Sequence, residues 1–496
     1  MFTFQDLEAV GNEESERMKF ILDAIEEYRN SDLYKVAVIG DDYDRGLNTT
    51  IKAYDKFFIS EDGSKKPDDI SPNHKMASSF FNRFTTQLNQ FLLGNGITWH
   101  GEAVRVPEGT PGAKRNQDLI FSNNGELVEI GTYWTVEKPS KAKELLGEDF
   151  DNRAQDLGKA SLVGKVAFGF FNKDHLEILK LGGRPDEPCF IPLIDEETSE
   201  LKAGVKYWQI ADNKPLRVTL FEIDGYTEYR YFDEKGKKQG EVMKPKTPYI
   251  VETSVSEVGG ARVSGGRNYK KLPIIPMWSN PEKQAEIIRI RDAIDAYDLI
   301  KNDYANDLDT AQIYWIIRGA LAAEDPDIAK FLDRLKTNKI ANVPDNRDVE
   351  MQTVDLPYAA REQLLDRISA DLYRDFCALD VDNIRSGAVT ATQIEAAYEP
   401  LNSKADQYEY CVLEFLKQLL DLLGIEGEYA TFTRSKMINV NEDVQTVLSA
   451  AMQIGNDDYT TRKILTLLGD GDRADDIIAA KAADEINQLR IDNAED

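Results

Sequence analysis

Residues 358–379 read YAAREQLLDRISADLYRDFCAL, residues 380–390 read DVDNIRSGAVT, and residues 391–424 read ATQIEAAYEPLNSKADQYEYCVLEFLKQLLDLLG. This stretch decides the fold, because it holds two helical patterns on either side of a short polar break. From Ala359 to Leu379, apolar side chains recur every three or four residues and so share one face of a helix. They are Leu364, Leu365, Ile368, Leu372 and Phe376. At about 1.5 Å per residue, this helix is roughly 30 Å long.

The break at residues 380–387 contains Asp, Asn, Ser and Gly, which favour turns over helix. A second helix is predicted from about Val389. Pro400 lies inside it and predicts a kink, because proline has no N–H and clashes with the preceding turn. The apolar face continues to Gly424, a typical helix end, through Tyr408, Cys411, Val412, Phe415, Leu416, Leu419, Leu422 and Leu423. On this pattern alone, a helical hairpin within a core is the default interpretation.

Length and composition indicate a folded protein with more than one core. The chain has 496 residues, of which 42% are hydrophobic, and no run approaches the ~20 apolar residues that span a bilayer. The N-terminus lacks a signal-peptide pattern, so secretion by that route is not expected. Cys189, Cys377 and Cys411 form no CxxC pair and are predicted to be buried thiols. Three histidines are too few for a histidine-rich metal site, and no cofactor is expected.

The formal net charge of −28 is the most distinctive property of the composition. A protein that grips nucleic acid normally carries a basic patch that displaces counterions from the phosphates. Two interpretations remain. The acidity keeps a large particle in solution, or DNA passes close by without sticking.

The N-terminal third alternates predicted helices with loops. Residues 5–30 predict an acidic amphipathic helix, and residues 65–72 a loop. A second helix is predicted from Asn73 through the paired Phe80 and Phe81 to Leu93, with Gly94 as its end. Residues 115–145 are predicted to be irregular, and residues 141–162 to be helical.

Residues 162–255 change to short β-type runs that predict an antiparallel meander. The runs cover 166–171, 176–179, 207–210, 217–223 and 226–232, with turns predicted at Asp224-Gly225 and Lys235-Gly236. The glycine pairs around Arg262 and Arg267 predict a flexible basic loop without the Lys-Ser/Thr of a phosphate-binding loop.

A long helix is predicted to open at Pro281 and to carry one apolar stripe: Ile287, Ile290, Ile294, Tyr297, Tyr304 and Leu308. Its six aspartates are expected to face solvent. Residues 312–356 then predict a strand, a short helix over 328–335, and a second strand. After Gly424 a strand is predicted near Tyr429, followed by helices over about 442–454, 459–468 and 474–491.

Four motifs, taken together, resemble the portal proteins of tailed bacteriophages, of the kind found in siphophages of Gram-positive hosts. The first is Asn73-x-Lys75 leading through paired phenylalanines to Leu-Leu-Gly94, although the family often has Pro-Ile where this chain has Gly96-Ile97. The others are the Asp-Ala-Tyr-Asp helix at 295–298, the Ser-Gly to Thr-Ala-Thr junction at 386–392, and the Asn-x-Asn-Glu signal at 439–442. They occur in the family's order, and the resemblance covers roughly residues 35–490.

The resemblance implies an α+β portal fold. The expected parts are a wing with an antiparallel sheet at 1–280, stem helices at 281–311 and 358–379, and a small α/β clip at 312–357. A tunnel loop at 380–391, a kinked wing helix at 392–429 and a helical crown at 430–496 complete it.

The resemblance also implies a function without catalysis. Identical subunits, usually twelve, form a ring at one capsid vertex, and double-stranded DNA passes through it during packaging and ejection. The implied partners are the terminase large subunit, a head-completion or adaptor protein, and the major capsid and scaffold proteins. No membrane is involved, and the implied location is the virion, with host cytoplasm during assembly.

Two groups of site residues follow from the resemblance. The tunnel-loop residues expected to face DNA are Asp380, Asp382, Asn383, Arg385, Ser386 and Gly387. The clip residues expected to dock partners are Arg318, Asp333, Arg334, Lys336, Asp345 and Arg347.

Two other classes of function stay open. An acidic metal-dependent nuclease or hydrolase would account for the many carboxylates, although no localised carboxylate–lysine or histidine motif supports it. Another non-enzymatic phage head protein would also fit. The mass in solution separates the classes, because a portal forms a closed ring and an enzyme is expected to be a monomer or dimer.

Overall fold

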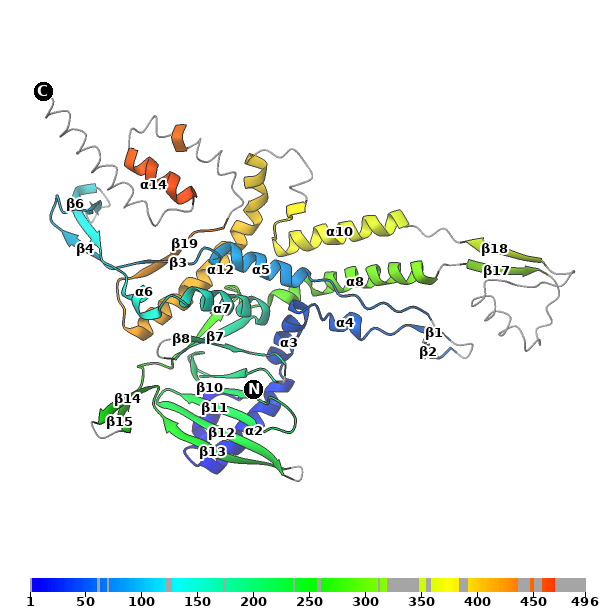
Figure 1. The fold of residues 1–496 in the computed structure, drawn as a ribbon, viewed down its shortest axis with the longest axis horizontal. Helices are drawn as coiled ribbons and strands as arrows, with labels where there is room; N and C mark the ends of the chain where they lie inside the picture. The colour runs from blue at the N-terminus through cyan, green and yellow to red at the C-terminus, as the bar shows by residue number, and fades with distance from the viewer. Residues whose placement is uncertain are drawn as a thin grey trace. The chain divides into compact units, whose positions relative to one another are not determined.

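The computed structural model describes residues 2–59, 63–68, 71–121, 127–172, 175–184, 186–234, 237–256, 260–310, 313–318, 348–353, 358–382, 391–435, 447–449 and 457–468 (Figure 1). The chain forms two compact units. One contains residues 1–381 and 399–433, and the other contains residues 382–398 and 434–496. Both helices and sheets are present, as the α+β prediction requires, whereas the wing, clip and crown stay predictions.

The first unit is built around an eight-stranded sheet of order β13-β12-β11-β10-β9-β8-β7-β16. Its pairings are antiparallel except the short β8–β9 contact at Lys180 and Cys189. The strands are β7 Val166–Asn172, β8 His175–Lys180, β9 Cys189–Ile194, β10 Leu201–Trp208, β11 Leu216–Glu222, β12 Gly225–Glu234, β13 Lys237–Thr247 and β16 Ile274–Trp278. The predicted meander is confirmed, including the turn before Gly225, whereas the turn predicted at Lys235-Gly236 lies outside the described residues.

Three N-terminal helices pack on this sheet: α1 Phe4–Val10, α2 Glu14–Asn30 and α3 Asp32–Asp44. The short helix α4 Thr49–Lys52 lies against α8 instead, where Arg291 donates to the Thr50 hydroxyl. The single helix predicted over 5–30 is interrupted at Gly11, where φ is 71°. From α2, Ile21, Ile25 and Tyr28 enter the same core as alternating residues of the strands, such as Val218 on β11. This alternation is why a half-polar strand can bury one face.

The other strands form smaller sheets that are separate from the eight-stranded sheet. They are β1 Phe57–Ile59 with β2 Lys65–Pro67, β3 Ile97–His100 with β19 Tyr429–Phe432, β14 Ile250–Ser256 with β15 Gly260–Arg267, and β17 Ile313–Arg318 with β18 Asp348–Thr353. A three-stranded sheet contains β4 Ala103–Val106, β6 Leu127–Glu137 and β5 Lys114–Phe121. The prediction that residues 115–145 are irregular is therefore wrong. The strands predicted after residue 312 and near Tyr429 are confirmed, and the helix predicted over 328–335 lies outside the described residues.

The first unit also contains α5 Phe80–Leu93, the short α6 Lys141–Leu146, α7 Phe150–Gly164, α8 Glu286–Thr310 and α10 Tyr358–Phe376. Helices α8 and α10 lie side by side and antiparallel (Figure 1), because Asp307 pairs with Arg361 while Tyr297 and Tyr373 both contact the ring of Phe80. We call α8 and α10 the helix pair.

Helix α8 begins five residues later than the sequence predicts. The Asn280 side chain accepts a hydrogen bond from Gln284 N–H (3.1 Å) and donates to Gln284 C=O and to the Glu286 carboxylate. These bonds hold residues 280–285 in turns, so Pro281 opens no helix.

Helix α12 runs from Ala391 to Leu423 without interruption at Pro400, and the predicted kink stays a prediction. It ends at Gly424 as predicted, with φ of 70° and a hydrogen bond from Ile425 N–H to Leu420 C=O (2.9 Å). The second unit contains α14 Asp457–Leu468, which confirms a helix predicted there. Of the other two predicted crown helices, residues 447–449 are described and helical, and residues 474–491 lie outside.

Cys189 and Cys411 are buried, as predicted, whereas Cys377 is half-buried. In the part of the chain that the structure describes, no helix is long and apolar enough to cross a membrane.

Candidate functional site

An extended segment, residues 71–79, lies along α8 and is held there by side chains of the helix. We call this segment the strap. Asn306 Oδ1 accepts from His74 N–H (2.8 Å) and Asn302 Oδ1 accepts from Met76 N–H (2.8 Å). Ser78 N–H donates to both carboxylate oxygens of Asp298, at 3.0 and 3.1 Å.

The spacing of the two elements explains this arrangement, which we call the amide ladder: Asp298, Asn302 and Asn306. Residues four apart on a helix are separated by about 6.0 Å along its axis, and residues two apart in an extended chain by about 6.6 Å. The two repeats nearly coincide, so each turn of α8 meets one N–H of the strap. The helix predicted to begin at Asn73 therefore begins at Phe80, because the ladder binds the main chain of residues 74–78.

Asp298 is the most buried carboxylate of α8, with 0% of the residue exposed. Besides Ser78 N–H, it accepts from the side-chain amide of Asn48 at 2.8 Å. Burial raises the pKa of Asp298, and the hydrogen bonds from Asn48 and Ser78 oppose that rise. The expectation that the aspartates of this helix face solvent is wrong here, because a carboxylate can accept several bonds from a main chain packed against it.

Other aspartates of α8 also have partners. Asp295 accepts a hydrogen bond from Tyr43, Asp307 forms an ion pair with Arg361 of α10, and Asp309 lies 2.5 Å from His74 Nε2. Asp292 is exposed, as the sequence predicts. These contacts fix α8 against the N-terminal helices, the strap and α10.

Helix α5 anchors the other member of the pair. Its Phe84 stacks on Phe376 of α10 with ring centroids 5.1 Å apart, and Arg83 donates to the Tyr373 hydroxyl (2.7 Å). Beyond the end of α10, Gln87 donates to Leu379 C=O (3.0 Å) and accepts from Leu379 N–H (2.9 Å). Leu379 is buried, with 5% exposed.

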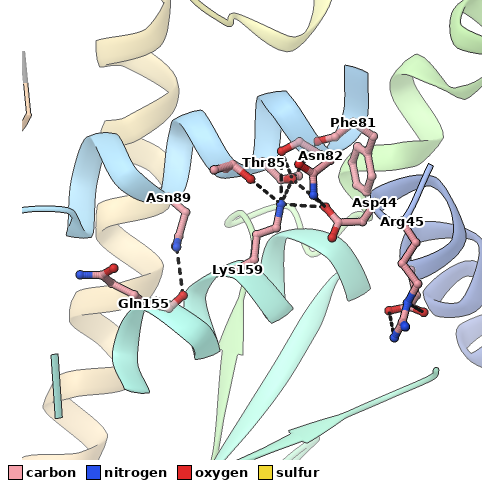
Figure 2. A network of polar contacts seen from close by, with 10 residues as sticks. Asp44, Arg45, Phe81, Asn82, Thr85, Asn89, Gln155 and Lys159 are labelled. Carbon is pink, nitrogen blue, oxygen red and sulfur yellow. Dashed lines mark hydrogen bonds and ion pairs between the residues drawn. The ribbon is translucent and has the colours of Figure 1, made fainter. Parts of the chain in front are cut away.

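On its opposite side, α5 is tied to α3 and α7 by Lys159, which Figure 2 shows pointing from α7 toward Asp44, Asn82 and Thr85. The ammonium group lies 2.7 Å from Asp44 Oδ1 and donates to the hydroxyls of Thr85 (2.6 Å) and Thr86 (2.9 Å). Burial lowers the pKa of Lys159, and the hydrogen bond to Asp44 opposes this shift. One cation therefore joins three helices.

The helix pair leaves apolar side chains uncovered. Leu308 on α8 is 54% exposed, and Tyr358 and Leu364 on α10 are 42% and 47% exposed. Toward the other end of α10, Leu372 and Phe376 are buried. The apolar stripe predicted for α10 is thus only partly covered within one chain.

Only some of the predicted site residues lie in the part of the chain that the structure describes. Asp380 and Asp382 follow the Gln87 contact and are described, and Asp382 is exposed. Asn383, Arg385, Ser386 and Gly387 lie outside the described residues, as do Asp333, Arg334, Lys336, Asp345 and Arg347. Arg318 ends β17 opposite Asp348.

Sequence reasoning missed Gln87, Lys159 and the amide ladder. The four-residue spacing of Asp298, Asn302 and Asn306 was a usable signal, since it places three amide or carboxylate groups on one helix face. Nothing local marks Gln87, whose partner is 292 residues away. Among the described residues, no group of three His, Cys, Asp or Glu side chains is placed to hold a metal ion.

Comparison with known proteins gives consistent matches. The family model described as "Phage portal protein, SPP1 Gp6-like" matches residues 28–465. A portal protein of Bacillus phage SPP1 is 27% identical over 407 residues, which cover 78% of this chain and 72% of the relative. A portal protein of Clostridium phage phiCD119 is 24% identical over 342 residues, which cover 65% of this chain and 71% of the relative.

Proposed function

The chain belongs to the SPP1 Gp6-like family of phage portal proteins, and from this premise we propose that it assembles with identical copies into a closed ring. The ring, a dodecamer, occupies one vertex of the capsid after assembly in the host cytoplasm. Double-stranded DNA enters and leaves the capsid through its central opening. A separate terminase motor drives the DNA, so the ring needs no catalytic residues.

The main observation that supports ring assembly is the set of exposed apolar side chains on the helix pair. Leu308, Tyr358 and Leu364 each expose two-fifths or more of their surface, in a chain whose net charge is −28. Contiguous exposed apolar patches on soluble proteins often mark sites of association, and in this proposal the three side chains belong to one such patch of the helix pair. A second copy packed against the pair covers these side chains, and a ring covers them in every copy.

The acidity supports the passage of DNA. A lining of negative charge repels the phosphates at every position along the opening, so the moving duplex meets no strong binding minimum. In this proposal Asp380, Asp382, Asn383, Arg385, Ser386 and Gly387 line the narrowest part. Arg385 and Asn383 contact the DNA backbone weakly, and repulsion between the carboxylates and the phosphates prevents strong binding.

The segment 312–357 is proposed to dock the terminase large subunit first and the head-completion or adaptor protein afterwards. The pairing of β17 with β18 gives this segment a two-stranded base, consistent with an independent docking unit. Arg318, Asp333, Arg334, Lys336, Asp345 and Arg347 are the charged residues proposed to contact these partners. Deletion of the β17 and β18 segments is expected to abolish both interactions.

The particle mass in solution tests the proposal. Wild-type protein is expected to give particles near twelve times the 56.0 kDa of one chain. Leu364→Lys adds a charge to the exposed apolar surface and is expected to shift the particles to single chains. Gln363→Lys is the matched control, because Gln363 is the exposed neighbour on α10 and is already polar. Retention of full rings by Leu364→Lys contradicts the proposed interface.

The same preparation separates the alternatives. A metal-dependent nuclease is expected to cleave DNA when Mg²⁺ is added and to remain a monomer or dimer. A portal is expected to leave DNA intact under those conditions. Oligomers without a central opening would instead indicate another non-enzymatic phage head protein.

A further inference from the structure

The chain leaves α10 through a tightly defined turn. Cys377 N–H bonds to Arg374 C=O (3.1 Å), and Ala378 N–H bonds to Tyr373 C=O (2.9 Å). Cys377 has a φ of 62°, in the left-handed region that side-chain-bearing residues rarely adopt. These bonds end the helix at a fixed residue and turn the chain sharply.

Gln87 then fixes the residue that follows this turn. A glutamine side chain carries one carbonyl acceptor and an NH₂ donor, so it can pair with the N–H and the C=O of one residue, as a neighbouring antiparallel strand does. Here both groups are used, with bonds of 2.9 Å from Leu379 N–H and 3.0 Å to Leu379 C=O. Leu379 is the last buried residue before Asp380.

The helix that carries Gln87 is itself held on two sides. Phe84, one turn earlier on α5, stacks on Phe376 near the end of α10. Thr85 accepts a hydrogen bond from Lys159 on α7. Leu379 is therefore bonded to a platform that cannot shift without breaking contacts in three helices.

We propose that Gln87 is a positioning residue that sets where and in which direction the chain leaves the helix pair toward Asp380 and Asp382. Its role in DNA passage rests on the proposed function, in which residues 380–391 face the DNA. Gln87 touches no DNA in this account. It acts through Leu379, the residue directly before Asp380.

Amide hydrogen exchange of the assembled wild-type protein and of Gln87→Met tests the contact directly. Methionine has nearly the same length and a similar helix propensity, but it makes neither bond. Loss of both bonds is expected to raise the exchange rate at Leu379 N–H by about ten- to a hundredfold, while amides in the middle of α5 keep their rates. Unchanged exchange at Leu379 overturns the proposal.

Gln90→Met is the matched control, since Gln90 lies on the same helix and its side chain makes one long, exposed contact to Gln155 (3.4 Å). It is expected to leave exchange at Leu379 unchanged. An equal increase in both variants would mean that α5 as a whole has loosened, and it would also overturn the proposal.

Gln87→Glu gives a readout that packing alone would not move. The ionised carboxylate accepts from Leu379 N–H but cannot donate to Leu379 C=O, whereas the protonated carboxyl does both. Protection at Leu379, corrected for the intrinsic pH dependence of exchange, is therefore expected to recover as the pH falls from about 8 to about 5, toward the titration range of the introduced carboxyl. A flat profile like that of wild-type protein overturns the proposal.

The consequence for DNA is measured in capsids carrying wild-type or Gln87→Met protein together with their packaging motor. The variant is expected to form rings of wild-type mass and to package less DNA. Normal packaging despite lost protection at Leu379 overturns the positioning role and leaves the proposed function intact. Failure of the wild-type protein to form rings or support packaging overturns the proposed function. The contact between Gln87 and Leu379 is then still tested by the hydrogen-exchange experiment.

Discussion

Replacing Asn302 by alanine is the sharpest test of the amide ladder. The side chain accepts from Met76 N–H at 2.8 Å and donates to Met76 C=O at 2.9 Å, and the residue is only 3% exposed. Alanine removes both bonds to the strap and also the bond that Asn302 donates to Asp298 C=O (2.7 Å), and it leaves the main chain of Met76 facing a small gap. The strap then remains attached by its two neighbouring rungs, Asp298 and Asn306.

The size of the effect follows from the contacts. Each hydrogen bond contributes a net of about 0.5–1.5 kcal/mol, so the three bonds of Asn302 account for roughly 1.5–4.5 kcal/mol. Alanine forms helix better than asparagine, which returns about 0.5 kcal/mol. The expected loss in the free energy of unfolding is therefore about 1–4 kcal/mol. Asp292→Ala, at an exposed position of the same helix, is expected to stay within about 0.5 kcal/mol of wild type.

Urea unfolding followed by circular dichroism gives the free-energy difference, and hydrogen exchange shows where it acts. Exchange at the amides of residues 74–78 is expected to accelerate more than exchange in the eight-stranded sheet. Asn302→Ala with a stability equal to that of Asp292→Ala would refute the ladder. Equal acceleration throughout the unit would show that the strap is not the element released.

Three further predictions concern neighbouring contacts. Cys377→Gly is expected to increase the free energy of unfolding by about 1 kcal/mol, because glycine adopts a left-handed φ without strain. Cys377→Ala is not expected to increase it. Equal urea midpoints for the two variants would contradict this prediction. Lys159→Met is expected to cost about 1–3 kcal/mol, because the half-buried Asp44 carboxylate loses its ion pair and keeps only the hydrogen bonds from Asn82 and Thr85. Lys143→Met is the exposed control, and a loss no larger than that of the control would argue against the three-helix junction. Burial raises the pKa of Asp298, so the folded state binds this proton more tightly than the unfolded state does. The stability of the wild-type protein relative to Asp298→Asn is therefore expected to rise as the pH falls through the pKa of Asp298 in the folded state. Parallel curves of stability against pH would contradict this.

The elements that sequence predicted well have strong local signals. Helix α5 has a wide apolar face and ends at Gly94, and α12 ends at Gly424 with a left-handed φ. The meander was predicted because its strands alternate and its turns contain glycine. In each case the residues that decide the structure lie within a few positions of one another.

The errors arose where distant partners decide the structure. Residues 73–79 have a helical pattern, but their main chain bonds to side chains of α8 more than 200 residues away. Strands β5 and β6 alternate weakly, and the Asn124-Gly125 turn signal between them was overlooked. Asp298 was expected in solvent because a single sequence does not show that a strap covers it.

The candidate site divides in the same way. The two long helices were predicted from their apolar repeats, and the structure has α8 and α10 there. That the segment 380–391 faces DNA stays a prediction from the family resemblance. The residue that fixes the start of that segment, Gln87, could not be found from sequence, because its contact with Leu379 joins parts of the chain that only the fold brings together. The net charge of the chain predicted neither the position of this segment nor the contact between Gln87 and Leu379.

The central claim is that copies of this chain surround an opening through which DNA moves. Electron microscopy of the assembled protein, viewed along its symmetry axis, tests it most directly. The account predicts a closed ring in which Leu364 packs against a neighbouring copy and residues 380–391 line the opening. A particle without an opening, or a ring in which those residues lie far from the axis, would contradict it.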